Sequence, residues 1–192
     1  MLAAAKRKYP TFSKCAAAYS SAIQRILLAD LEKAYSEKSL TLSELSRMYN
    51  SDSPVLWMKT QLLSLDFASS QKEGADMDAI TEFSELFVNQ YPHTKLTEFL
   101  LFIARFKLGR YGKFYGYFDT LTIGEGFRKF LRERSDELDM LIRKRNNETV
   151  ERRYQDPVVH EHAMPDYLRC YLDTTKKGEK NGSDNLLDEE RS

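Results

Sequence analysis

The chain has little of what marks secreted, metal-binding or membrane-spanning proteins. Only two of its 192 residues are cysteine, Cys15 and Cys170, and their spacing fits neither a disulfide framework nor a zinc site. No apolar run approaches the roughly 20 residues that a helix needs to span a bilayer. The chain starts with apolar residues before Lys6-Arg7-Lys8, the reverse of the order in a secretory signal. We therefore expect a cytoplasmic protein without membrane contact.

Signals for catalysis and for bound groups are also missing. The sequence has no glycine-serine nucleophile elbow, no phosphate-binding loop ending in Lys-Ser or Lys-Thr, and no HExxH motif. His160 and His162 flank Glu161, but their spacing matches no established metal site, and we interpret them as ordinary polar residues. The sequence thus predicts no catalytic residue, no metal site and no cofactor, which favours a non-enzymatic protein.

Positive charge is unevenly distributed, although the totals balance at 29 Lys and Arg against 29 Asp and Glu. Residues 94–145 carry 12 basic against 7 acidic side chains. This local excess permits a surface that binds polyanions, but cations on helices also commonly do no more than keep a surface solvated. Both interpretations remain open from the sequence. We interpret the acidic residues between 133 and 139 as partners of nearby arginines on an exposed helix face.

Apolar residues recur every three or four positions along most of the chain, and no segment alternates with period two. This pattern predicts an all-α fold, a compact bundle of five or six helices. We expect a helical domain over residues 1–146. Residues 147–192 are expected to form a flexible C-terminal tail, loosely docked at first and then disordered, because its charged, apolar-poor end cannot offset the entropy of ordering.

Capping residues and breaks predict where most of these helices begin. Thr41 with Glu44 forms a capping-box pattern, Asp76 is a potential N-cap, and Thr122 with Glu125 repeats the capping-box pattern. The helix over 95–108 is apolar on nearly all sides, which is typical of a central helix. The expected helices cover residues 12–38, 42–49, 55–68, 77–91, 95–108 and 123–145.

Residues 42–65 have the outline of a DNA-reading helix-turn-helix. The second helix of this pair offers only Lys59 and Gln61 as contacts to bases or phosphates, and the surrounding segment is acidic. We therefore favour ordinary packing for these two helices.

Five of the eight glycines fall between residues 109 and 126, beside the basic and aromatic run Arg110-Tyr111-Gly112-Lys113-Phe114-Tyr115-Gly116-Tyr117-Phe118. Aromatic rings can stack on bases while nearby cations neutralise phosphates, which is the chemistry of nucleic-acid binding. The rings can equally fold back as a lid over the core. The predicted binding site consists of Arg105, Lys107, Arg110, Tyr111, Lys113, Tyr115, Tyr117, Arg128, Lys129 and Arg132.

The same run carries a resemblance to a known group of proteins. Phe106-Lys107-x-Gly109-Arg110-Tyr111-Gly112-x-Phe114-Tyr115-Gly116, then Asp119 and Phe130-Leu131-Arg132-Glu133-Arg134, resembles the signature of small uncharacterised helical proteins of gut anaerobic bacteria and their mobile elements. The similarity covers roughly residues 40–135. The resemblance implies a shared helical fold and singles out the glycine-aromatic run, but it implies no activity, because that family has none established.

Two functions fit these features. The first is a non-enzymatic accessory protein of DNA replication or mobile-element DNA metabolism, whose partners are DNA, RNA or a replication-type protein. The second is an adaptor that binds another protein through the aromatic rings and makes no nucleic-acid contact. The sequence leaves the oligomeric state open.

Overall fold

The structure is a computed structural model that describes residues 2–66, 76–112 and 119–155. Within these ranges the regular structure is helical, and no strand is present apart from an isolated bridge between Thr41 and Lys95. The predicted all-α class is therefore confirmed. The chain divides into two units, Met1–Leu141 and Ile142–Ser192. Most of the predicted C-terminal tail, residues 156–192, lies outside the described residues.

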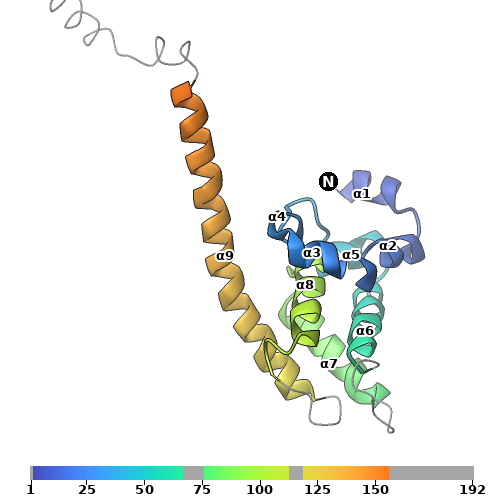
Figure 1. Cartoon of the computed structure of the whole chain (residues 1–192). Coiled ribbons are helices and arrows are strands. Elements are labelled where there is room, and N and C mark those ends of the chain that lie inside the picture. Colours follow the sequence, from blue (N-terminus) through green and yellow to red (C-terminus); the bar gives the residue numbers. More distant parts are fainter. Residues whose placement is uncertain (1, 67–75, 113–118, 156–192) are drawn as a thin grey trace, which may run out of the picture. The chain divides into compact units, whose positions relative to one another are not determined.

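Nine α-helices and one 3-10 helix are found in the described ranges (Figure 1). The last of them, α9, begins in the first unit and ends in the second. The helices are α1 (Leu2–Lys8), α2 (Phe12–Ala18), η1 (Ser21–Ile23), α3 (Gln24–Ala29), α4 (Leu31–Ala34), α5 (Leu42–Met48), α6 (Ser53–Asp66), α7 (Met77–Gln90), α8 (Leu96–Lys107) and α9 (Thr120–Gln155).

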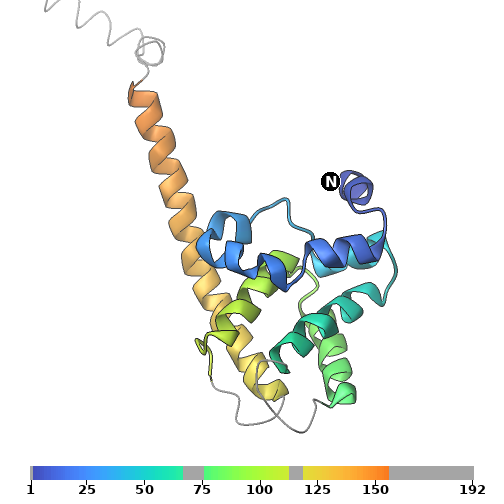
Figure 2. The same ribbon diagram turned by 45° about the vertical axis from the view of Figure 1, so that its right-hand side comes forward.

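Helix α8 is the centre of the first unit. Every residue from Leu96 to Phe106 is buried, as its apolar sequence predicts for a central helix. Figures 1 and 2 show α8 between α6 and α7 on one side and the amino-terminal part of α9 on the other. Because all faces of α8 are covered, the few polar side chains on it need partners inside the protein.

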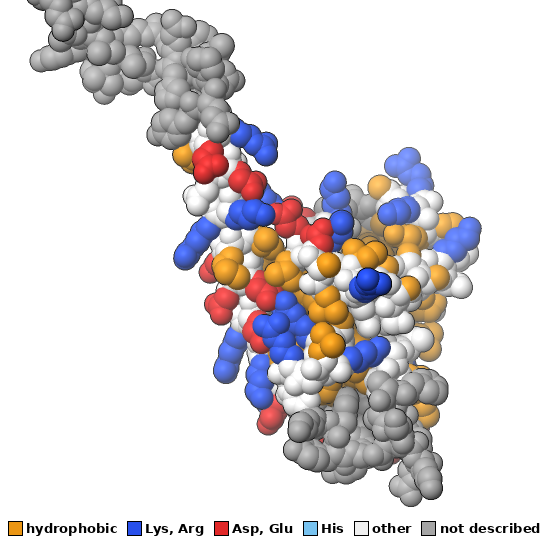
Figure 3. All heavy atoms as spheres, viewed as in Figure 1, with side chains coloured by type: hydrophobic (Ala, Val, Ile, Leu, Met, Phe, Trp, Pro, Cys, Tyr) orange, Lys and Arg blue, Asp and Glu red, His pale blue; other side chains and the backbone are white. Residues whose placement is uncertain are grey.

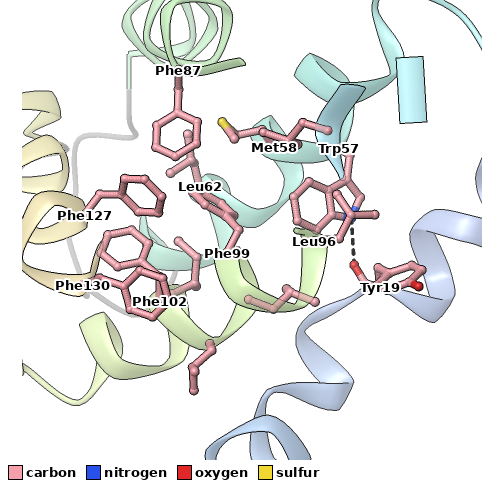
Figure 4. Packing of buried hydrophobic residues seen from close by; sticks show 14 of the residues in the cluster. Tyr19, Trp57, Met58, Leu62, Phe87, Leu96, Phe99, Phe102, Phe127 and Phe130 are labelled. Carbon is pink, nitrogen blue, oxygen red and sulfur yellow. Dashed lines mark hydrogen bonds between the residues drawn. The ribbon is translucent and has the colours of Figure 1, made fainter. Parts of the chain in front are cut away.

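An aromatic cluster joins α8 to α7 and α9 (Figure 4). Phe102 packs against Phe127 at 5.2 Å and against Phe130 at 5.7 Å between ring centroids, and Phe87 packs against Phe127 at 4.6 Å. Most of these pairs are tilted or edge-to-face, the geometries that the ring quadrupole favours. This cluster is the apolar part of the junction between α8 and α9.

The helix starts at Thr41 and Asp76 are confirmed. The Thr41 hydroxyl accepts from the backbone N–H of Glu44, and the Glu44 carboxylate accepts from the N–H of Thr41, which is the complete capping box. Asp76 caps α7 by accepting from the N–H groups of Asp78 and Ala79. The start of α8 uses another segment instead, because the N–H of Leu96 donates to the carbonyl of Leu40 at 2.8 Å.

The prediction of a single helix over residues 12–38 is wrong. This segment forms α2, η1, α3 and α4, with extended backbone at Ser20 and Asp30 between them. Asp30 ends α3 and caps α4 by accepting from the N–H of Lys33, so its side chain competes with helical continuation. The carbonyl of Tyr19 accepts from the indole N–H of buried Trp57 at 2.8 Å, a tertiary hydrogen bond that periodicity does not reveal.

Both ends of the last helix also differ from the prediction. Asp119, rather than Thr122, caps α9: its carboxylate accepts from the N–H of Leu121 at 3.0 Å and from the Thr122 hydroxyl. Thr122 therefore lies inside the first turn and forms no capping box. The helix continues beyond the expected end near Arg145 to Gln155. The apolar stripe ends near Arg145, but the polar residues that follow include no glycine or proline and so do not break the helix.

Packing explains the pair α5 and α6, as favoured above. Gln61, one of the two contact residues that a helix-turn-helix would offer, is buried, and Lys59 is half-buried. The same helix buries Trp57, Met58 and Leu62 against the core. A recognition helix has to expose its reading residues, so the burial of Gln61 favours ordinary packing for α6.

Two glycines of α9 provide a test of how tightly it packs. A Cβ on Gly126 would lie 2.9 Å from Cε2 of Phe106 and 3.0 Å from Cβ of Tyr111, whereas a Cβ on Gly124 would meet nothing within 4 Å. We expect Gly126→Ala to lower the free energy of unfolding by about 1–3 kcal/mol through overpacking. Gly124→Ala should raise it by up to about 1 kcal/mol, because alanine favours the helix. Urea unfolding measures both, and equal effects would contradict the close approach.

Candidate functional site

The polar centre of the junction between α8 and α9 is the Arg105 guanidinium. Its side chain is only 6% exposed, yet it lies on α8 in the last turn, facing α9. Nη2 contacts Oε1 of Glu137 at 2.7 Å, and Nη1 contacts Oε2 of Glu133 at 3.3 Å. The two glutamates are four residues apart, so they share one face of α9 and can hold the guanidinium between them.

Two tyrosines extend this network. The Tyr35 hydroxyl, from the residue that ends α4, donates to Oε2 of Glu137 at 2.5 Å. The Tyr111 hydroxyl donates to Oε2 of Glu133 at 2.6 Å. Burial, and then the bond to Glu137, raises the pKa of Tyr35. Burial and the bond to Glu133 raise the pKa of Tyr111 in the same way. Both phenols therefore stay protonated and continue to donate.

Arg105 keeps its charge in this site. Burial by itself lowers the pKa of a guanidinium, but the hydrogen bonds to Glu137 and Tyr111 more than compensate, and the net pKa is raised. A second ion pair lies nearby, between Nε of Arg134 on α9 and Oε2 of buried Glu98 on α8, at 3.0 Å. Each of the two helices thus contributes both an arginine and a glutamate to the ion pairs of the junction.

The segment after α8 leads directly from this network to the surface. Gly109 has φ +76°, in the left-handed region that favours glycine, and its N–H donates to the carbonyl of Phe106 at 2.8 Å. The N–H of Arg110 donates to the carbonyl of Arg105 at 3.2 Å, which completes a Schellman motif. This turn fixes where Arg110 and Tyr111 leave the helix.

Two of the predicted binding residues lie in the interior. Arg105 is bound to Glu133 and Glu137, and the Tyr111 ring packs 5.6 Å from the Phe102 ring with its hydroxyl on Glu133. Neither side chain offers a surface to a ligand, so their place in the predicted site is corrected: they hold the junction together. The lid interpretation of the aromatic run thus applies to Tyr111.

The other predicted residues divide into exposed cations and residues that are not described. Arg110 is 49% exposed, and Lys107 is exposed with its Nζ donating to Oε1 of Gln24 at 3.3 Å. The Lys107 residue is exposed as a whole, but partial desolvation of its side chain against the protein lowers its pKa. The exposed cations on the amino-terminal half of α9 are Arg128, Lys129 and Arg132. Outside the described residues lie Lys113, Tyr115 and Tyr117.

These exposed residues of α9 form a short basic face. Arg128 lies four residues and Lys129 three residues before Arg132, so both share a side of the helix with Arg132. None of them forms an ion pair with a described residue, although Glu125 and Asp136 lie on the same side. Figure 3 shows Lys and Arg side chains over this part of α9, interspersed with acidic ones. We call Arg110, Arg128, Lys129 and Arg132 the cationic surface.

The sequence interpretation missed the glutamates of the junction. Residues 133–139 were expected to pair on an exposed face, but Glu133 and Glu137 face Arg105. A signal was present, because these positions continue the inward stripe from Phe130 at helical spacing. Charge concealed it, since carboxylates face inward only when a buried partner is present.

An open hollow of about 470 Å³ lies near α4, away from the predicted site. Asp30 and Lys33 in its wall pair with each other at 2.9 Å, and Ser39 Oγ accepts from the N–H of Thr97 at 3.4 Å. The hollow is lined by charges of both signs, and some of its polar groups already bind one another, so it favours no particular class of ligand. Its lining consists of Lys8, Tyr19, Asp30, Glu32, Lys33, Ser36, Lys38, Ser39 and Thr97.

The described parts of the chain contain neither a candidate metal site nor a helix suited to span a membrane. No group of three or more His, Cys, Asp and Glu side chains is arranged to hold a metal ion there. No helix in those parts has the length and apolar character needed to cross a membrane. His160, His162 and Cys170 lie outside the described residues, and Cys15 is buried.

Removing the Arg105 charge should strongly destabilise the protein. Arg105→Met fills similar space but leaves Glu137 and Glu133 without their buried counter-charge, so we expect the free energy of unfolding to fall by about 3–5 kcal/mol. Arg128→Met removes an exposed arginine and should change it by less than about 0.5 kcal/mol. Urea unfolding of both variants measures the difference. A small effect at Arg105 would show that the network does not hold the junction.

The raised tyrosine pKa values predict a loss of stability at alkaline pH. Above about pH 10 the unfolded chain loses phenolic protons that folded Tyr35 and Tyr111 retain. Their contribution is thus fully present below that pH and falls by about 1 kcal/mol for each phenol between about pH 10 and 11. The Tyr35→Phe/Tyr111→Phe variant should lose less stability than the wild type over this interval. Urea midpoints across the pH range test this, and parallel losses would contradict it.

Comparison with known proteins gives a family but no activity. No curated protein and no solved structure matches the chain. Residues 77–176 match the family of unknown function DUF6633, and this range contains α7, α8, the cationic surface and both junction glutamates. The match covers more than half of the sequence. The chain therefore belongs to DUF6633, a family of unknown function.

Proposed function

We propose that this protein is a non-enzymatic accessory protein that binds nucleic acid through the cationic surface. The observation that carries the proposal is the set of three exposed cations on one side of α9, Arg128, Lys129 and Arg132, without an ion-pair partner among the described residues. Arg110 adds a half-exposed guanidinium. It lies near these cations because it contacts Glu133, which is four residues after Lys129 on the same helix. Such cations bind phosphates by releasing condensed counterions.

The packing of α8 and α9 supports a rigid base for this surface. The aromatic cluster and the Arg105 network fix the amino-terminal part of α9 against the core, so the cations project from an element that does not have to order on binding. A pre-ordered surface loses less entropy on association than a mobile one. The process that we propose is DNA replication or mobile-element DNA metabolism in the cytoplasm, because the sequence resembles proteins of bacteria and their mobile elements, although no activity is established for those proteins.

A protein-binding adaptor is the second candidate. Leu108 after α8 and Leu121 in the first turn of α9 are 73% and 78% exposed, although both flank the otherwise packed junction. Exposed leucines next to cations suit an acidic partner helix with an apolar stripe. Binding of this kind depends on apolar contact and is less sensitive to salt than phosphate binding.

A titration at two salt concentrations tests the first proposal. Fluorescence anisotropy of labelled single-stranded and duplex DNA of about 20 nucleotides should show binding that weakens about 50- to 150-fold between about 50 and 200 mM salt, as about four phosphate contacts predict. The Arg128→Gln/Lys129→Gln/Arg132→Gln variant should reduce the salt slope by about 2–3.

A matched control variant distinguishes a specific effect of this surface on DNA binding from a general effect of net charge. The exposed residues Lys14, Arg25 and Arg47 lie elsewhere on the chain, and their replacement by Gln removes the same charge and the same residue types. We expect this control variant to keep most of the affinity. Equal losses in the two variants, or no DNA binding by the wild type, would contradict the proposed function. Binding that is insensitive to salt would favour the adaptor.

A further inference from the structure

The two oxygens of Glu133 have different surroundings. Oε2 points into the junction, where it accepts from the Tyr111 hydroxyl at 2.6 Å and from Nη1 of Arg105 at 3.3 Å. Oε1 accepts from Nε of Arg110 at 3.2 Å. The Glu133 side chain is 30% exposed, in contrast to the buried guanidinium of Arg105. One oxygen is therefore fixed by interior groups, while the other can exchange its partner.

The charges around Glu133 are balanced in the absence of a ligand. Arg105 and Arg110 supply two positive charges, and Glu133 and Glu137 supply two negative ones. Glu137 is already held by Arg105 at 2.7 Å and by the Tyr35 hydroxyl. The carboxylate available to Arg110 is thus Glu133, and its pairing removes one cation from the cationic surface.

A phosphate that binds Arg110 side-on, through Nε, would occupy the place of this contact. Nε is the only guanidinium nitrogen of Arg110 that donates a hydrogen bond to a described residue, and its acceptor is Oε1 of Glu133. A phosphate that takes Nε together with one Nη group in a bidentate pair has to displace Oε1. Lys129 lies four residues before Glu133 on the same face of α9, so the incoming phosphate would also meet Lys129.

We propose that Glu133 is an internal competitor for the phosphate of a bound nucleic acid, which occupies Arg110 in the free protein and lowers the affinity of the cationic surface. The inference rests on the proposed function and adds regulation to it. Glu133 also retains its interior bonds through Oε2 when Oε1 is displaced, so the exchange does not require the junction to open.

The test compares Glu133→Gln with Glu125→Gln. Glutamine at 133 removes the charge but keeps an oxygen for the Tyr111 hydroxyl, and Arg105 keeps Glu137. Glu125 is exposed on the same helix, four residues before Lys129, and it pairs with no described cation. We expect Glu133→Gln to tighten binding of single-stranded DNA by about two- to five-fold more than Glu125→Gln at low salt.

The same comparison in an Arg110→Gln variant tests whether the gain in DNA affinity depends on Arg110. With Arg110→Gln already present, the two glutamate substitutions should have equal effects, because the competing contact no longer exists. Equal effects in the wild-type background, or weaker binding by Glu133→Gln, overturn the inference and leave the proposed function intact if the wild type binds. DNA binding by neither the wild type nor Glu133→Gln overturns both.

A measurement on the unmodified protein covers the case in which Glu133→Gln does not fold. The Nε–H resonance of Arg110, assigned from its loss in Arg110→Gln, reports directly on the bond to Glu133. Addition of the same single-stranded DNA should shift this resonance with the dissociation constant found by anisotropy. A resonance that stays unchanged at saturation would show that Arg110 keeps Glu133 in the complex and would overturn the inference.

Discussion

The burial of one charged group, the Arg105 guanidinium, constrains how α8 and α9 meet. An arginine in the interior is tolerated only when carboxylates and hydrogen bonds replace its water. Glu133 and Glu137 supply the carboxylates, and their spacing of four residues fixes the rotation of α9 about its axis. That rotation in turn places Phe127 and Phe130 against Phe102 and leaves the opposite face of α9 exposed.

The same constraint divides the basic and aromatic segment into two parts with different roles. Arg105 and Tyr111 point inward and stabilise the junction, whereas the four residues of the cationic surface face solvent. Glu133 lies on the boundary between these parts and contacts both. One carboxylate thus serves the donors of the inner network and a donor of the cationic surface.

The central position of α8 has a second consequence, at its amino terminus. Because this helix is buried on every side, its first N–H groups cannot turn to water, and the segment around Leu40 supplies acceptors for them. Lys95 Nζ also donates to the carbonyl of Tyr35 at 3.0 Å. Tyr35, which ends α4, therefore has two contacts around α8. Its carbonyl accepts from Lys95 just before the start of α8, and its hydroxyl donates to Glu137, the partner of Arg105 in the last turn of α8.

Local patterns in the sequence determined the helical class, the capping box at Thr41, the cap at Asp76 and the buried helix α8, because each depends on residues close along the chain. The tertiary structure decided what depends on distant partners. It broke the segment before residue 38, where the Tyr19 carbonyl binds Trp57, and it turned Glu133 and Glu137 inward toward Arg105. Helical spacing places a carboxylate on a face, but whether that face is buried depends on which counter-charge the fold brings to it.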